Sequence, residues 1–587
     1  MKKLIKKFLI ALLVVCVSSA GLWAQAGAEP ADEFYSLVER WEILGIIEEQ
    51  PPLRPYPLTL IDSILSEVIE GEYEFESQRA EECYESIFNK PWKIKVEGTA
   101  NIKTGDDPSK QIIPEGYFAG DLYLSSLVSA AYKIGVIVTN NKTLDSIPVY
   151  RALPYFFHDP VDLGKLNAFL SMDTSFAIAK DNIYAQLGLN HNSFGPFYND
   201  SAVISPDAQH TANFSFMYDL GRVSYTQALF GLTASNYKGR NLFAKKFLAL
   251  HSINADVFPW LTASFYEASM FGNRFEPAYL VPIPFIITQS LAGFEDNIFM
   301  GISFTVRPFS GFAWVNDIFV DDVSLNDLLR LHFDTKLRGT LQSAIKYAPS
   351  NISWLDMVNL DYTLVTPYMY AHQQDVSDLS TGKSTIGSKY AVNYQEYTTA
   401  GEPMGLSISP NSQKVALSVS LVPVKHLKIT ATGAYICHSN VSESLPEDEA
   451  LSYLNSPEGY FTTDGTIYNH QHYFKDGDST KSKYLGSAWN HFLFLCQPTK
   501  MHTFQANLDA SYSIPTAKLG NFSFGLGYTF ERIINYGVDR DIFIGTSKDG
   551  NPGTATSADV QKSLETWRAG LTNKTNHYVR INFKYEW

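Results

Sequence analysis

The sequence has no long run of hydrophobic residues after residue 30, and it has no excess of positive charge. A membrane-spanning helix needs about 20 consecutive apolar residues, so we expect no such helix beyond the first 30 residues. The formal net charge is -15, which argues against nucleic acid as a partner because phosphate binding needs a basic surface. Charged residues make up only 18% of the 587 residues, whereas aromatic residues make up 14%. This composition fits a membrane protein that presents its apolar residues one at a time along strands.

Recognisable catalytic and metal-binding patterns are also lacking. The chain has four cysteines, one of which is Cys16 near the N-terminus. No phosphate-binding loop, catalytic set or metal-ligand spacing stands out. We therefore expect a protein that is not an enzyme, holds no cofactor and binds no metal.

The residues from His577 to Trp587 alternate between two chemical classes. One class is apolar: Val579, Ile581, Phe583, Tyr585 and Trp587. The other is almost wholly polar: Tyr578, Arg580, Asn582, Lys584 and Glu586. Side chains alternate across a β-strand, so this stretch predicts a strand with one apolar face and one polar face. Such a strand suits a half-buried soluble sheet, or a transmembrane barrel with lipid outside and a polar lumen inside.

The connections between strand-like segments favour the barrel. About eighteen segments from residue 92 onwards show strand-like alternation. Some are joined by tight turns: 181–182, 219–222, 259–260, 308–311, 423–426 and 516–519. Long polar connections alternate with these turns: 104–116, 140–164, 191–210, 235–244, 270–297, 321–335, 370–412, 438–499 and 533–576. Outer-membrane barrels have short turns at one end and long loops at the other. We therefore predict an all-β transmembrane antiparallel barrel of about eighteen strands over residues 91–587, with Trp587 as an anchor at the membrane interface.

Two regions precede the predicted barrel. Residues 1–28 combine a lysine-rich start with the apolar run Phe8–Val17 and then small residues, which predicts a cleaved signal peptide and export. Residues 29–90 contain three stretches with helical periodicity, the second capped by Thr59 and the third running from Ser77 to Phe88. We expect a small helical bundle on the periplasmic side, which is either an independent spacer or a plug of the barrel.

Several stretches of the chain resemble a known family in the same order. Residues 190–208 carry a Gly-Pro turn followed by Ser, Ser and Ala, and the stretches 246–251, 319–322, 362–372 and 397–405 follow. Together they resemble the Wzi family of capsule-assembly proteins over nearly the whole mature chain. The sequence departs from the family pattern at the Gly-Pro turn, where Phe197 stands in place of a second glycine, and at residues 191–194, where the common tryptophans are absent.

The resemblance implies a barrel in the outer membrane of a diderm bacterium, inserted by the barrel-assembly machinery. It implies partners in the lipid bilayer and in surface polysaccharide, which the extracellular loops would bind or organise as a lectin does. Aromatic rings that stack on sugar rings, beside amides and carboxylates that bond hydroxyl groups, suit this role. We expect the ligand-binding residues to be Gly195, Pro196, Phe197, Tyr198, Asn199, Asp200, Tyr279, Asp296, Asn297, Tyr370, His372 and Tyr397. The same residue types also make a loop soluble and ordered.

Other interpretations remain open. The same fold could serve as a porin for small solutes. His191 and Ser193 would share one face of a strand, as the histidine and serine of an outer-membrane phospholipase do. Asp296-Asn297 and Asp321-Asp322 could bind a divalent ion or simply form solvated turns.

Cys437 and Cys496 lie near the predicted ends of two neighbouring strands, on either side of a long loop. Adjacent antiparallel strands would bring them to a similar height, and an exported protein can form disulfides. We therefore expect a disulfide between them.

Overall fold

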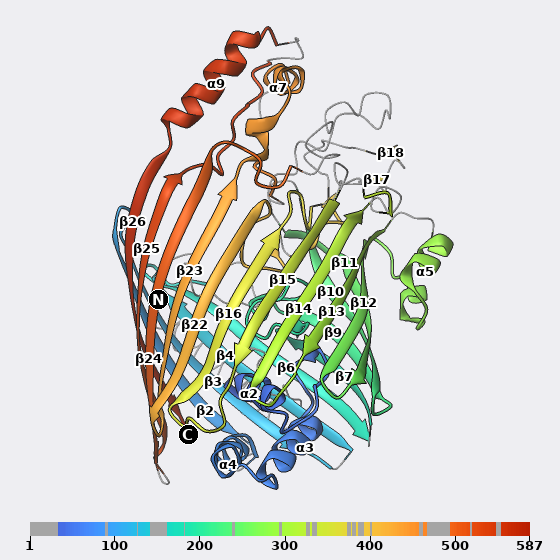
Figure 1. Cartoon of the computed structure of the whole chain (residues 1–587), viewed down its shortest axis with the longest axis vertical. Coiled ribbons are helices and arrows are strands. Elements are labelled where there is room, and N and C mark those ends of the chain that lie inside the picture. Colours follow the sequence, from blue (N-terminus) through green and yellow to red (C-terminus); the bar gives the residue numbers. More distant parts are fainter. Residues whose placement is uncertain are drawn as a thin grey trace.

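The chain forms one closed antiparallel barrel of eighteen long strands (Figure 1). A computed structural model describes residues 33–88, 92–125, 127–140, 161–180, 182–236, 241–292, 296–323, 329–331, 337–371, 377–378, 383–384, 392–399, 402–456, 462–466, 493–516, 519–547 and 553–587. The long strands are β2 (Lys93–Gly105), β3 (Ser109–Tyr123), β4 (Val128–Thr139), β6 (Asn167–Lys180), β7 (Ile183–Asn190), β9 (Thr211–Asp219), β10 (Val223–Asn236), β11 (Asn241–Phe258), β12 (Leu261–Gly272), β13 (Asn297–Val306), β14 (Phe312–Val323), β15 (Leu337–Tyr347), β16 (Leu355–Val365), β22 (Ser412–Val424), β23 (Leu427–Ser439), β24 (Lys500–Thr516), β25 (Gly520–Tyr536) and β26 (Thr572–Glu586). The predicted fold class is confirmed, whereas the predicted signal peptide at 1–28 lies outside the described residues.

Pairing of the first long strand with the last closes the barrel. Each residue of β2 from Lys95 to Gly105 has a partner on β26. Beyond the end of β26, Ile94 and Trp587 exchange two backbone hydrogen bonds of 2.9 and 3.0 Å. Closure leaves no strand edge exposed, which matters because an unpaired backbone group in lipid costs several kcal/mol.

The side chains of β26 divide between lipid and lumen as the alternation predicts. Ile581 is paired with Leu526 on β25, and both side chains are more than half exposed on the outer face. The intervening Arg580 forms an ion pair with Asp509 of β24, with 3.1 Å between Nη2 and Oδ1, and points into the lumen. One face of this strand therefore contacts lipid, and the other faces the polar lumen.

The strand boundaries depart from the prediction between β2 and β3, and also between β10 and β11, where the predicted connection 235–244 is shortened to residues 237–240. Residues 104–116 were expected to be a long loop, but β2 runs to Gly105 and β3 begins at Ser109. The prediction failed because β3 starts with the polar residues Ser109, Lys110 and Gln111, which look like loop residues. We call the end with tight turns, such as the one between β22 and β23, the short-turn end, and the opposite end the long-loop end.

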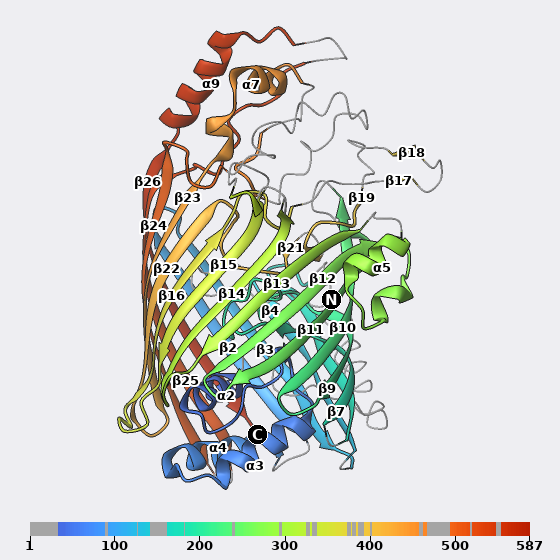
Figure 2. The same ribbon diagram turned by 45° about the vertical axis from the view of Figure 1, so that its right-hand side comes forward.

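The wall of the barrel is not equally tall all round (Figures 1 and 2). Strands β24 and β25 have 17 residues each, whereas β7 has 8 and β9 has 9. At about 3.3 Å per residue, the tall strands are roughly 56 Å long and the short ones roughly 26–30 Å long. The wall strands are therefore longest at β11, β24 and β25 and shortest at β7 and β9.

Three helices lie at the short-turn end, and α2 sits inside the barrel there (Figure 1). They are α2 (Glu33–Leu44), α3 (Leu58–Ile69) and α4 (Glu74–Phe88). Their apolar faces share one core that includes Trp41, Leu65 and Ala80. The helix α3 begins after Pro57, so Thr59 is inside the helix and is not its cap. None of the described helices is long and apolar enough to cross a membrane.

Ion pairs fix this helical region to the barrel wall. The Arg40 guanidinium lies 2.8 Å from the Glu76 carboxylate and donates to the Pro349 carbonyl at 3.0 Å. Arg79 reaches Asp356 at 2.8 Å, and Lys346 of β15 pairs with Glu39. These contacts show that the helices dock against the wall and the turn between β15 and β16.

Two long loops form a folded cap at the long-loop end (Figure 2). The cap contains the 3-10 helix η2 (Val441–Ser444) and the helices α7 (Glu447–Leu454) and α9 (Ser557–Ala569). These elements share a core of their own with residues 538–543: Ala450, Leu454, Val538, Ile542, Phe543, Val560 and Trp567. A further short helix pair, η1 (Pro277–Leu280) and α5 (Phe285–Ala292), lies on the outer wall.

The remaining described elements are short strand pairs. These are β1 (Leu53–Arg54) with β8 (Ser193–Phe194), β17 (Ser377–Asp378) with β18 (Lys383–Ser384), and β20 (Thr398–Thr399) with β21 (Glu402–Pro403). Two more, β5 (Val161–Asp162) and β19 (Val392–Asn393), pair with long strands. Of these, the pairing of β1 with β8 matters most, because it joins the helical region to a segment inside the barrel.

A charge on the lipid-facing side of β26 should be far more disruptive than the same charge one residue later. Ile581→Lys places an ammonium group against lipid, and we expect it to destabilise the inserted barrel by about 2–4 kcal/mol. Asn582→Lys, the matched control, points into the polar lumen and should cost less than about 1 kcal/mol. Reversible urea unfolding in lipid vesicles measures both. Equal destabilisation by the two variants would contradict the assigned faces.

Candidate functional site

The segment between β7 and β9, residues 191–210, folds into the barrel interior. Its apolar residues join lumen-facing residues of the wall in one core: Phe194, Ala202, Val203 and Ile204 with Phe230, Leu248, Tyr266, Phe299 and Phe319. We call residues 191–210 the inward segment. The prediction that 191–210 is an external loop was wrong. Polar side chains that hydrogen-bond to groups in the lumen have the same sequence pattern as polar side chains that hydrogen-bond to water.

The Gly-Pro turn of the inward segment is fitted closely to its surroundings. Gly195 has a φ of +117°, and a Cβ at this position would lie 2.9 Å from the Ser201 hydroxyl oxygen. The turn therefore requires glycine. Phe197 is buried with Ile43 of α2 and Ala344 of β15. The predicted sugar-stacking ring instead packs between the helical region and the wall.

Arg54 joins the helical region to the inward segment. It is fully buried; its Nε donates to the Ser193 hydroxyl at 2.9 Å and its Nη2 to the Gly195 carbonyl at 2.7 Å. Its guanidinium also lies 4.1 Å from the centre of the Tyr198 ring, a favourable cation–π contact. The predicted ligand residues Gly195 and Tyr198 are thereby part of a structural junction.

Glu42 of α2 completes this junction and borders a cavity of about 120 Å³. Its carboxylate accepts hydrogen bonds from the Tyr198 hydroxyl at 3.0 Å and the Gln50 backbone N–H at 2.8 Å. Burial, together with the nearby Glu49 carboxylate, raises the pKa of Glu42 from 4.5 to about 8, although Arg307 opposes the shift. Arg307 forms an ion pair with Glu49 at 2.5 Å. The cavity thus combines acidic, guanidinium and phenolic groups that could bond a hydroxyl-rich molecule.

A second stretch of the chain, which includes Tyr370, Tyr397 and Met404, packs against the inward segment. Tyr370 and Tyr397 are buried, with ring centres 5.6 Å apart, and the Tyr370 hydroxyl donates to the Ala202 carbonyl at 2.7 Å. Ser205 donates its backbone N–H to the Met404 carbonyl at 2.8 Å. Tyr370 and Tyr397, two predicted ligand residues, therefore stabilise the interior instead of facing a surface ligand.

Asn199 and Asp200 are the most accessible polar residues of the predicted set on the inward segment. Asn199 is exposed, and the Asp200 carboxylate lies 2.9 Å from Lys414 Nζ on β22. Ser407 donates to it through both its backbone N–H at 3.0 Å and its hydroxyl at 2.6 Å. This partly exposed cluster can exchange hydrogen bonds with a solute in the lumen.

The remaining predicted residues are spread over the two faces of the wall. Tyr279 and Asp296 bond to each other at 2.7 Å under η1 and α5 on the outer face, where Arg274 also reaches Asp296 at 2.5 Å. These partners of Asp296 are those of a turn, not of an ion site. Asn297 faces the lumen and donates to the Gln395 carbonyl at 3.3 Å. His372 lies outside the described residues. The predicted residues therefore do not form one site.

Two further predictions are not supported. Ser193 accepts from Arg54, while His191 Nδ1 lies 2.7 Å from the Ala208 carbonyl oxygen, so these two side chains are held by different partners and do not form a histidine–serine pair. Cys437 and Cys496 are both free thiols. Cys437 is buried at the end of β23, whereas the exposed Cys496 donates to the Leu493 carbonyl.

Sequence reasoning missed one cluster in the lumen, formed by Asp173, His191 and His210. Their separations of 18 and 19 residues match no metal-binding spacing. Asp173 lies on β6, whereas the two histidines lie at opposite ends of the connection between β7 and β9. Only the inward fold of residues 191–210 brings them together. This cluster, unlike the dispersed predicted set, has the residue types that could hold a metal.

Glu42 should make the docking of the helical region depend on pH. Its pKa is 4.5 unfolded and about 8 folded, so the folded state holds the extra proton between these values. Stability should therefore fall by about 2–4 kcal/mol as the pH rises from 5 to 8. Glu42→Gln keeps an oxygen acceptor for Tyr198 and Gln50 but cannot ionise, so it should flatten this dependence. Hydrogen exchange of α2 in wild type and variant at each pH measures the effect; parallel pH profiles would rule out Glu42 as its source.

No family model and no curated protein matches the sequence. Among solved structures, the chain is similar to Wzi of Escherichia coli, described as an outer membrane protein involved in group 1 capsule assembly and a carbohydrate-binding β-barrel. The identity is 10%, the match covers 95% of this chain and 98% of that one, and the TM-score is 0.50. OccK8 (OprE) and OprD of Pseudomonas aeruginosa match at 8% identity each, over 84% and 85% of this chain and 97% and 94% of theirs, with TM-scores of 0.40. The chain therefore has the fold of the Wzi outer-membrane barrel, as the sequence resemblance predicts.

Proposed function

We propose that the protein binds polysaccharide at the surface of the outer membrane, with its short-turn end in the periplasm and its long-loop end outside. The observation that carries this proposal is the folded cap. Loops that only connect strands need no apolar core, whereas the two loops of the cap bury Leu454, Phe543 and Trp567 together. A preordered surface loses little conformational entropy when it binds a ligand. The fold shared with a carbohydrate-binding barrel supports the same role.

Hydrogen bonds hold the two loops of the cap in one arrangement. Asn440 donates to the carbonyls of Val538 and Arg540 at 2.7 and 2.9 Å. Phe543 and Thr462 are joined by a backbone hydrogen bond of 2.9 Å. These contacts connect the loop after β23 to the loop after β25, so the two loops form one folded unit.

The cap presents groups that suit sugar hydroxyls. Asp539 and Arg540 are exposed, and the Arg540 guanidinium lies 5.6 Å from the centre of the Tyr536 ring. Burial, followed by the nearby carboxylates of Asp464 and Asp539, raises the pKa of Asp541 to about 6. Carboxylates and a guanidinium beside an aromatic ring can accept and donate hydrogen bonds to neighbouring hydroxyl groups. We therefore place the ligand on this part of the cap.

Removal of the two carboxylates should weaken polysaccharide binding. We expect Asp539→Ala/Asp541→Ala to reduce retention of cell-surface polysaccharide from the source bacterium about tenfold, or ~1.4 kcal/mol. Glu565→Ala, which removes an exposed carboxylate from α9 in the same cap, is the matched control and should change retention less than twofold. Affinity co-purification with the detergent-solubilised barrel measures all three. If wild type retains no more polysaccharide than the double variant, the proposal fails.

A second candidate, passage of small solutes, rests on the opposite half of the lumen. There the inward-facing charged residues are only partly buried, as in the pairs Asp509–Arg580 and Glu97–Lys584 at 3.1 and 3.7 Å. Ionic side chains along one wall, beside a plugged half, could line a narrow aqueous path.

Conductance in a planar bilayer separates the two candidates. We expect wild type to show little steady conductance, because the inward segment and the helices fill much of the lumen. Replacing residues 194–204 with a flexible linker of equal length should open stable channels. Steady open channels in wild type whose ion selectivity shifts in Arg580→Ala would favour solute passage over a closed binding protein.

A further inference from the structure

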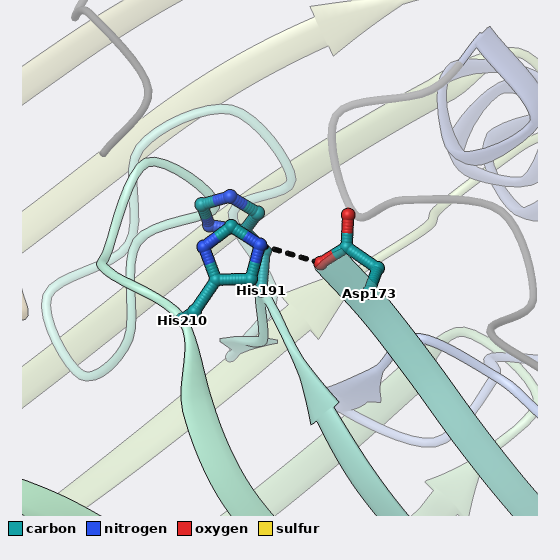
Figure 3. A group of neighbouring side chains, drawn as sticks. All are labelled: Asp173, His191 and His210. Carbon is teal, nitrogen blue, oxygen red and sulfur yellow. Dashed lines mark ion pairs between the residues drawn. The ribbon is translucent and has the colours of Figure 1, made fainter. Parts of the chain in front are cut away.

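Asp173 of β6 meets His191 and His210, the two ends of the inward segment, in the lumen (Figure 3). Asp173 is on β6, directly opposite Lys133 of β4 in the strand register. His191 follows the last residue of β7, and His210 precedes the first residue of β9. One potential ligand atom from each side chain lies within 4.8 Å of the other two. The three side chains are nearly inaccessible to solvent, at 3%, 4% and 6% exposed respectively.

The hydrogen bond of His191 fixes which of its nitrogens is basic. Its Nδ1 lies 2.7 Å from the Ala208 carbonyl oxygen, which can only accept, so Nδ1 carries the proton. Nε2 therefore carries the lone pair. Donation of one ring N–H to a backbone carbonyl is the arrangement that orients a metal-binding histidine.

His210 and Asp173 lie at ion-pair distance, but their geometry does not make a hydrogen bond. His210 Nε2 lies 2.6 Å from Asp173 Oδ1. Within the described residues, however, neither atom has a partner with hydrogen-bond geometry, and the buried Nδ1 of His210 has none either. The two imidazole rings are in contact, with centroids 3.8 Å apart. Buried polar atoms are normally satisfied, so an incomplete set of this kind requires an explanation.

We infer that Asp173, His191 and His210 bind one divalent transition-metal ion, with zinc as the best fit. Two imidazoles and one carboxylate are ligands that zinc accepts, with a water molecule in the fourth position. Ligand atoms around a tetrahedral zinc are about 3.4 Å apart, and the three potential ligand atoms here lie within 4.8 Å of one another. The ammonium group of Lys133, which lies opposite Asp173 in the strand register, is 4.3 Å from the centre of the Tyr117 ring.

The position of the site indicates what the ion does. His191 and His210 are the first and last residues of the inward segment, and Asp173 belongs to the wall. One ion would therefore tie both ends of the segment to β6 and close the segment as a loop. A metal that joins distant parts of a chain stabilises the folded arrangement by its binding free energy. Zinc should thus hold the inward segment inside the barrel.

Zinc titration of the full-length, detergent-solubilised barrel tests this inference. After treatment with a chelator, wild type should bind one Zn²⁺ per chain, measured by competition with a chromophoric chelator. His210→Gln, His191→Gln and Asp173→Asn should each weaken the binding at least about tenfold. His438→Gln is the matched control, because His438 is also buried and lies 3.0 Å from a carboxylate, that of Asp464, in the lumen. It should leave the zinc affinity unchanged.

Hydrogen exchange provides a readout that does not depend on the affinity of a variant. Zinc should slow exchange in residues 191–210 of wild type and have no such effect in Asp173→Asn. Heat-modifiable migration in gels shows whether each variant still forms a folded barrel. The inference is overturned if wild type binds no zinc, if the three variants bind it as wild type does, or if zinc leaves the exchange of residues 191–210 unchanged.

Discussion

Backbone hydrogen bonding across the seam between β2 and β26 is the constraint on which the whole structure depends. Eighteen strands cannot remain in lipid with an open edge, because each unpaired N–H and C=O there is costly. Closure in turn sets the circumference, and eighteen strands enclose more space than the wall side chains can fill. The helices and the inward segment are therefore consequences of closure, since they occupy the space that closure creates.

Charge, more than apolar contact, determines where these interior parts sit. Arg40, Arg54 and Lys346 are buried, and each bonds to a partner on a neighbouring part of the chain: the Pro349 carbonyl, Ser193 and Glu39, respectively. Removal of one member of a buried ion pair leaves an uncompensated charge, which costs several kcal/mol. An interior element held this way has one favoured position. The apolar core around Phe194 and Tyr266 adds cohesion but little directional preference.

The sequence predicted features that depend on local periodicity and missed features that depend on long-range contacts. Two-residue alternation identified the lipid face of β26, and helical spacing identified α2 and α3. Nothing local distinguishes a loop in water from one in a polar lumen, so the interior position of Phe197, Tyr198 and Tyr370 could not be predicted. The start of α3 was misplaced because Pro57 can precede a helix without a side-chain cap. The free thiols of Cys437 and Cys496 show that similar height on neighbouring strands does not bring two side chains together.

The same limit applies to the candidate site. The sequence contains Asp173, His191 and His210 without any sign that they meet, because their proximity depends on the path of residues 191–210 through the lumen. The sequence likewise contains no sign that the acidic residues of the cap lie close together. Asp464 and Asp541 are 77 residues apart, and they come near each other only because the cap folds as one unit.

If the protein binds polysaccharide as proposed, the unequal height of the wall has a consequence for the direction from which a long polymer arrives. Among the described residues, β24 to β26 and the cap rise above the rim on one side, while β7 and β9 end low on the other (Figure 2). A polymer much longer than the barrel is wide would meet least obstruction across the low side, travelling parallel to the membrane. It would then lie against the tall wall along its length instead of entering the barrel end-on.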